Sequence, residues 1–122
     1  MEYPEAKPDL KELAAALEDA RAGSPEFDRS IQAALSPYRP SPSDVPNSTR
    51  VFEDARRLMP ANSRLELSNF NVRDRWHASV YVRFGDRPRW VSQDAYGETP
   101  ALAVAAAGLR LQAWLHRAHA AK

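Results

Sequence analysis

Three polar residues near the middle of the chain have the side-chain types of a nucleophilic catalytic triad, namely Asp74, His77 and Ser79. On a strand, His77 and Ser79 would point to the same side, because side chains alternate across the strand. Triad chemistry also needs a strained turn that exposes the nucleophile and N–H groups that stabilise an oxyanion. The sequence shows no signal for either requirement, so we expect no catalytic residue and no enzymatic activity.

Two histidines near the end of the chain could share one face of a helix and bind a metal ion, because His116 and His119 are three residues apart. We expect solvated histidines instead, since both fall in the last turns of the expected helix. The chain has no cysteine, which excludes thiolate metal sites and disulfides. The four glycines are scattered and form no phosphate-binding loop. We therefore expect neither a metal nor a cofactor.

Positive charge is concentrated in the middle of the chain. Residues 1–49 carry five Lys or Arg against nine Asp or Glu, a net charge of −4. Residues 50–90 carry nine Arg against five Asp or Glu, a net charge of +4. Such a stretch could bind an anion such as nucleic acid. The alternative is that these arginines are solvated or pair with the acidic first half of the chain.

A candidate surface for a protein partner or nucleic acid lies within this basic stretch. Its residues belong to an expected loop over residues 69–75 or to the hairpin that follows, and they are Arg73, Arg75, His77, Tyr81, Arg83, Arg87 and Arg89. The partner would be another protein, a second copy of this chain in a homodimer, or nucleic acid as the alternative.

Aromatic residues of the same region could stack on the bases of a single strand, as Tyr81, Trp90 and Tyr96 would do on an open sheet face. Tryptophans on a three-stranded sheet, such as Trp76 and Trp90, more often belong to its core or cover one of its faces. If the face that carries Tyr81 is bare, Tyr81 would form an exposed patch with His77, Ser79 and Arg83.

The elements that must position these side chains follow from apolar spacing and from helix caps. Residues 1–7 are expected to form a disordered tail. Residues 8–36 predict a helical hairpin, and residues 37–47, which contain four prolines, predict a loop. Residues 48–118 predict an α-β-β-β-α core, and residues 8–122 a single α+β domain.

Within this core, Ser48 would cap a helix that ends near Met59. The expected strands cover residues 63–68, 76–84 and 87–93, with a two-residue turn at Gly85 and Asp86. In the second strand, apolar residues alternate with polar ones, which predicts a three-stranded antiparallel sheet covered on one face by the helices before and after it. Pro88 indicates that the third strand lies at an edge.

The last helix has the most distinctive sequence, since Thr99 would be its N-cap and Pro100 its first residue. Small residues follow, and Gly108 costs about 1 kcal/mol in a helix relative to alanine. This composition predicts close contact with another backbone, from the sheet or the third helix.

Several segments resemble, in the same order, a family of small phage and prophage proteins described as the phage α-β-α sandwich domain. The segments are residues 10–20 (LKELAAALEDA), 26–35 (EFDRSIQAAL), 48–60 (STRVFEDARRLMP) and 99–109 (TPALAVAAAGL). The resemblance spans residues 10–114, but the strands and the loop over residues 37–47 depart from it. It implies a phage or prophage origin and transfers no catalytic residue.

The order of elements also resembles that of double-stranded-RNA-binding domains, which recognise the shape of the duplex through phosphate contacts. Such domains carry lysines at the start of the last helix, where this chain has Ala101, Leu102, Ala103 and Val104. We therefore expect a non-enzymatic phage-type protein that binds another protein, with nucleic-acid binding through the arginines of residues 50–90 as the alternative.

Neither resemblance suggests a membrane protein. No apolar run approaches the roughly 20 residues that span a bilayer, and residues 1–11 lack the apolar segment of a secretory signal. Together with the absence of cysteine, this favours a cytoplasmic location, which would be that of the host cell for a phage protein, and no membrane partner.

Overall fold

The structure is a computed structural model that describes residues 9–36, 45–69, 75–83 and 90–120, with side chains up to Arg117. The expected tail over residues 1–7 and the turn at Gly85 and Asp86 lie outside the described residues, as does most of the expected proline-rich loop.

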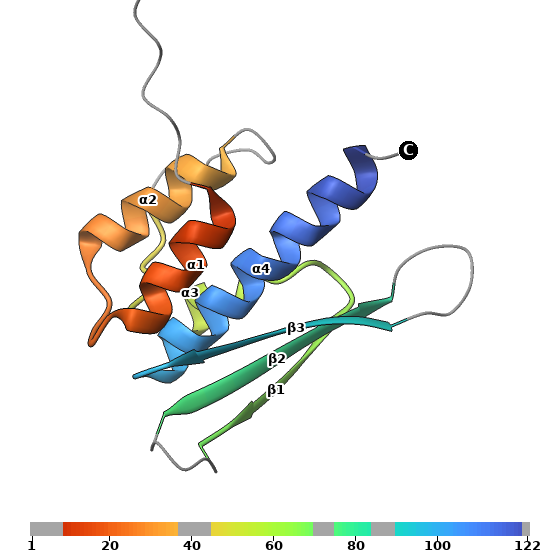
Figure 1. Ribbon diagram of the computed structural model, residues 1–122. Coiled ribbons are helices and arrows are strands. Elements are labelled where there is room, and N and C mark those ends of the chain that lie inside the picture. The colour runs from red at the N-terminus through yellow and green to blue at the C-terminus, as the bar shows by residue number, and fades with distance from the viewer. Residues whose placement is uncertain (1–8, 37–44, 70–74, 84–89, 121–122) are drawn as a thin grey trace, which may run out of the picture.

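The described chain is an α+β fold in which all helices lie on one side of a three-stranded sheet (Figure 1). The helices are α1 (Leu10–Asp19), α2 (Pro25–Leu35), α3 (Phe52–Arg56) and α4 (Pro100–Ala120). The strands are β1 (Ser63–Ser68), β2 (Trp76–Arg83) and β3 (Trp90–Gly97), which pair in the order β1-β2-β3, all antiparallel.

The first two helices form the expected hairpin, and each begins at a side-chain cap. Asp9 accepts a hydrogen bond from the N–H of Lys11 at the start of α1, at 2.9 Å. Ser24 accepts one from the N–H of Phe27 at the start of α2, at 3.1 Å, and Pro25 follows it as the first helical residue. The helix expected to begin at residue 8 therefore starts two residues later.

The segment between the hairpin and the sheet departs from the prediction, because α3 has only five residues and Ser48 does not cap it. Thr49 instead bonds to a buried carboxylate of α2. Asp28 accepts hydrogen bonds from the N–H of Thr49 at 2.8 Å and from the Thr49 hydroxyl at 2.6 Å. Arg50 donates a third bond to Asp28 at 3.0 Å. Residues 48–50 consequently form turns, and the helix begins at Phe52.

The sheet has the two faces that alternation predicts. Ala78, Val80 and Val82 of β2 are buried, and the register places Leu65 and Leu67 of β1 beside them on this core face. The third strand differs from the expected residues 87–93. It continues to Gly97, because residues 94–97 pair with residues 76–79 of β2. As expected, β3 lies at an edge of the sheet.

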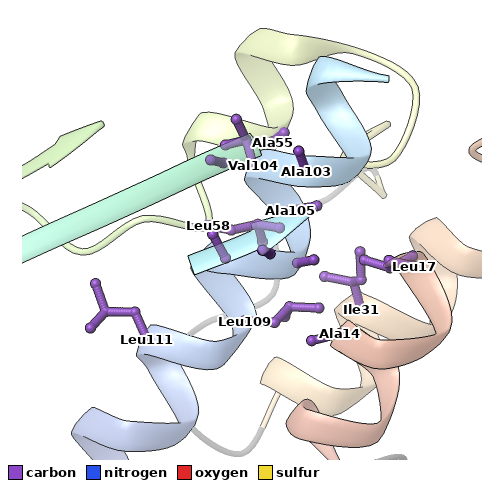
Figure 2. Packing of buried hydrophobic residues seen from close by; sticks show 14 of the residues in the cluster. Ala14, Leu17, Ile31, Ala55, Leu58, Ala103, Val104, Ala105, Leu109 and Leu111 are labelled. Atoms are coloured by element: carbon purple, nitrogen blue, oxygen red, sulfur yellow. The ribbon is translucent and has the colours of Figure 1, made fainter. Parts of the chain in front are cut away.

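Helix α4 occupies the centre of the fold and covers the core face of β2 and β3. Its cap is the expected one, since Thr99 accepts a hydrogen bond from the N–H of Leu102 at 3.2 Å. Figure 2 shows α4 between α1 and the segment that carries Ala55 and Leu58. The expectation that the helix before the strands also covers the sheet is wrong, because α3 packs mainly against α4, and α1 reaches β3 instead.

The small residues of α4 allow these close contacts. A Cβ atom added at Gly108 would lie 3.1 Å from the Cβ atom of Leu58 and 3.5 Å from its carbonyl oxygen. Gln112, one turn later, donates a hydrogen bond to the same carbonyl at 3.0 Å. The close neighbour predicted for Gly108 is therefore the chain just after α3.

Candidate functional site

The sheet face opposite α4 is the candidate site, and we call it the open face because no described helix covers it (Figure 1). The register arranges its side chains in rows across the strands. From one end to the other the rows are Arg83 and Trp90; Arg64, Tyr81 and Ser92; Glu66, Ser79 and Asp94; and Ser68, His77 and Tyr96.

One end of the open face holds an exposed tryptophan with two arginines beside its ring. Trp90 is 46% exposed, and the guanidinium groups of Arg64 and Arg83 lie 5.2 and 5.9 Å from its ring centroid. These distances fit cation–π contacts, which hold the charges beside the ring. The result is a cationic and aromatic surface.

The tyrosine beside this cluster connects it to a carboxylate. The Tyr81 hydroxyl donates a hydrogen bond to Glu66 at 3.1 Å. A shallow depression of about 640 Å³ lies over the same part of the sheet, lined by Arg64, Leu65, Glu66, Tyr81 and Trp90. Arginine, carboxylate and aromatic ring thus border one concave surface, which could receive a side chain from a partner.

The other end of the face carries a histidine, a tyrosine and an aspartate. Ser79 is 5% exposed and donates a hydrogen bond to Asp94 at 2.9 Å. His77 lies 3.7 Å from the other oxygen of Asp94, and its ring is 4.8 Å from that of Tyr96. Tyr96 itself is 43% exposed. This end is therefore acidic and aromatic.

This arrangement does not have the order of a catalytic triad. The Ser79 hydroxyl donates to Asp94, whereas a nucleophilic serine must donate to the histidine that will take its proton. Asp74, the third residue with a triad side-chain type, lies outside the described residues. Across the described part of the chain, no three His, Asp or Glu residues are close enough together to bind a metal. The side chain of His119 is not described, so the pair it forms with His116 is untested.

The structure brings together three of the seven candidate surface residues. His77, Tyr81 and Arg83 lie on the open face, as the alternation predicts. Arg73, Arg87 and Arg89 lie outside the described residues.

The seventh residue, Arg75, lies in a different environment. Its guanidinium donates a hydrogen bond to the carbonyl of Glu18 in α1 and lies 3.9 Å from Glu98. Arg75 therefore connects the sheet to α1, and it is not part of the open face.

Sequence reasoning missed other residues of this face. It assigned Trp76 and Trp90 alike to the core or to the cover of a sheet face, whereas Trp76 packs against the core and Trp90 is exposed. It also ended the third strand before Asp94. The alternation of β1 already placed Arg64 and Glu66 opposite the leucines, and this signal could have added them to the site.

A carboxylate of α1 bonds to the outer edge of β3, beside the site. Glu18 accepts hydrogen bonds from the N–H of Tyr96 at 2.8 Å and from the guanidinium of Arg110. Burial raises the pKa of Glu18, but these hydrogen bonds and the charges of Arg110 and Arg75 outweigh it, so the pKa lies below the ordinary 4.5. Arg110 also donates to the carbonyl of Asp94 at 3.0 Å. These contacts occupy polar groups of an edge strand.

Comparison of the chain with protein-family models, curated proteins and solved structures finds no match. No described helix is long and apolar enough to cross a bilayer.

Proposed function

We propose that this chain is a non-enzymatic protein of phage or prophage type that acts in the cytoplasm by binding a protein partner through its open face. The observation that carries the proposal is the exposed Trp90 with Arg64 and Arg83 beside its ring, on a sheet face that no described helix covers. Tryptophan, tyrosine and arginine are the residue types that contribute most to binding at protein interfaces.

The mixed charge of the face supports a protein partner over nucleic acid. Glu66 and Asp94 stand on the same face as Arg64 and Arg83, so a phosphate backbone laid along the sheet would meet carboxylates as well as arginines. A protein surface can match both signs, because its own charges are mixed. The phage or prophage origin rests on the resemblance of residues 10–114, and the cytoplasmic location rests on the sequence.

Nucleic-acid binding is the second candidate, because Trp90 and the two arginines offer a base-stacking surface beside positive charge. Other arginines of residues 50–90 are engaged within the chain. Arg50 binds Asp28, and Arg75 binds the Glu18 carbonyl. The first turn of α4, where duplex-RNA-binding domains carry lysines, is buried from Ala101 to Val104. These contacts favour a single strand at one end of the open face over a duplex.

The test compares the full chain with a Trp90→Ala variant. Each is immobilised and used to capture proteins from a nuclease-treated bacterial lysate. Val51→Ala is the control, because Val51 is 41% exposed and lies outside the sheet. Self-association is measured in parallel by sedimentation. We expect a bound protein, or a second copy, that Trp90→Ala loses by at least about tenfold and Val51→Ala retains.

Single-stranded DNA and RNA oligonucleotides of mixed sequence are titrated at low salt, where phosphate contacts are strongest. Oligonucleotide binding that Trp90→Ala removes, without any protein partner that depends on Trp90, would replace the proposal with the nucleic-acid candidate. If neither a protein nor an oligonucleotide depends on Trp90, the open face is not a binding site.

A further inference from the structure

The open face divides into two halves of opposite charge. The basic half holds Arg64 and Arg83, with Trp90 and Tyr81 beside them. The acidic half holds Glu66 and Asp94, with His77 and Tyr96 at its far end. Each half therefore combines formal charge with aromatic rings, and the boundary runs across the strands between the rows of Tyr81 and Ser79.

A twofold axis along this boundary would make the face complementary to itself. Such an axis lies between two facing sheets and runs perpendicular to their strands. It places each strand over the same strand of the second copy, with the order of the rows reversed. Arg64 of one copy then faces Glu66 of the other. At the ends of the face, Trp90 of one copy meets Tyr96 of the other. Every such contact occurs twice, as an isologous interface requires.

Packing of the two sheets is also compatible with their shape. Sheets that stack face to face keep their strands within about 30° of each other, about 10 Å apart. In the centre of the face, Ser79 is buried under its neighbours and bonded to Asp94, so it leaves no unpaired hydroxyl there. Across this axis Arg83 of one copy faces His77 of the other, and Ser92 faces Asp94, so the opposite formal charges that meet are those of Arg64 and Glu66.

The small size of the face favours a weak contact. Three strands about 4.8 Å apart, two of them eight residues long at about 3.3 Å per residue, present a face of roughly 14 by 26 Å. That is about 360 Å² per copy, or roughly 730 Å² for the two copies together, which is below the area of stable interfaces, so the association is weak and reversible. We expect a Kd of roughly 10 µM to 1 mM that weakens with added salt, because exposed charge pairs are screened.

We propose that the partner of the open face is a second copy of this chain, which packs its basic half against the acidic half of the first. This inference rests on the proposed function, because it names the protein that the face binds. It predicts that charge reversal on one half prevents self-association, and that reversal on both halves restores it.

The test is a charge swap between Arg64 and Glu66, followed by sedimentation equilibrium of the full chain at low salt. In a dimer of Arg64→Glu, a carboxylate at position 64 of each copy faces the carboxylate of Glu66 in the other. In a dimer of Glu66→Arg, a guanidinium group at position 66 of each copy faces the guanidinium group of Arg64 in the other. Each single variant should raise the dimer Kd at least about tenfold. The double variant, and an equimolar mixture of the two single variants, should dimerise again. In the double variant every contact pairs opposite charges, and in the mixed dimer the two copies carry opposite charges at this position.

Controls separate this contact from a general effect of charge. Arg29→Glu and Glu26→Arg reverse exposed charges of the same kinds on α2, and both should leave the dimer unchanged. Circular dichroism and thermal melting show that every variant is folded. Trp90→Ala should weaken the dimer as well, because it removes the aromatic contact at each end of the face.

Three results would overturn the inference. The wild-type chain could stay monomeric at about 1 mM, although a Kd of that value requires a free energy of association of only about −4 kcal/mol. The single variants could dimerise as the wild type does, which would place the contact elsewhere. The double variant and the mixture could fail to recover. If the chain is monomeric and another protein still binds in a Trp90-dependent way, the second copy is excluded and the proposed function stands.

Discussion

Glu18 shows how one carboxylate joins three elements of the fold. It lies in α1, accepts the N–H of Tyr96 in β3, and pairs with Arg110 in α4. All three groups are far apart in the sequence, so the contact exists only in the folded chain. The pKa of Glu18 is lowered for this reason, and the folded state favours its ionised form.

The first prediction concerns the pH dependence of stability. Because the pKa of Glu18 is lower in the folded than in the unfolded chain, its contribution is complete above the unfolded value near 4.5. That contribution is lost as the pH falls through the folded pKa. Glu18→Gln should therefore lower the melting temperature at neutral pH and lose less stability than the wild type does below about pH 4.5.

Thermal melts between neutral pH and about pH 3 measure this difference. Glu26→Gln is a suitable control, since Glu26 is exposed and forms only a 3.7 Å ion pair with Arg29. If the wild type and Glu18→Gln lose stability in parallel as the pH falls, the Glu18 contacts do not stabilise the fold.

At the scale of elements, α4 depends on the absence of a side chain at Gly108. Two substitutions separate helix propensity from packing. Gly108→Ala should change stability by less than about 1 kcal/mol, because the propensity gain offsets a Cβ contact of 3.1 Å with Leu58. Gly108→Leu should destabilise by roughly 1–3 kcal/mol, because its larger side chain has no space between α4 and the chain after α3.

Urea unfolding of both variants measures the two effects, with Arg117→Leu as a control at an exposed position of the same helix. Equal stability of Gly108→Leu and the wild type would show that α4 does not pack as closely against Leu58 as the structure indicates.

At the scale of the whole molecule, the N-terminal hairpin and the sheet share one core. Leu17 of α1 and Leu109 of α4 are fully buried in the same cluster (Figure 2). Asp28 provides a second contact between the hairpin and the rest of the chain, because it is 2% exposed and accepts hydrogen bonds from Thr49. The two halves of the chain should therefore unfold together.

This cooperativity predicts a single transition whose midpoint is the same by far-UV circular dichroism and by tryptophan fluorescence. The fluorescence reports mainly on the sheet and α4, because the three tryptophans are Trp76, Trp90 and Trp114. Leu17→Ala should lower both midpoints together, at a cost of roughly 2–5 kcal/mol. Two separate transitions, with only one sensitive to Leu17→Ala, would mean that the hairpin is an independent unit.

The sequence by itself determined the features that depend on neighbouring residues. Thr99 is the cap that its side chain predicts, and the alternation in β2 assigns its two faces correctly. Ser48 is not the predicted cap, because the neighbouring Thr49 bonds to Asp28, which is distant in the sequence. These features are local because a cap bonds within three residues and a strand alternates with a period of two.

Only the tertiary structure decided which surface is open and what lies on it. Asp94 and Gly97 are residue types that usually end a strand, yet pairing with β2 extends β3 through them, and Gly97 leaves room for the backbone of Ala103. The same register places Trp90 opposite Arg83 on the open face. Arg75, similar to the other arginines in sequence, reaches Glu18, which is 57 residues away. Register and long-range contacts join residues that are distant in the chain, so no local pattern contains them.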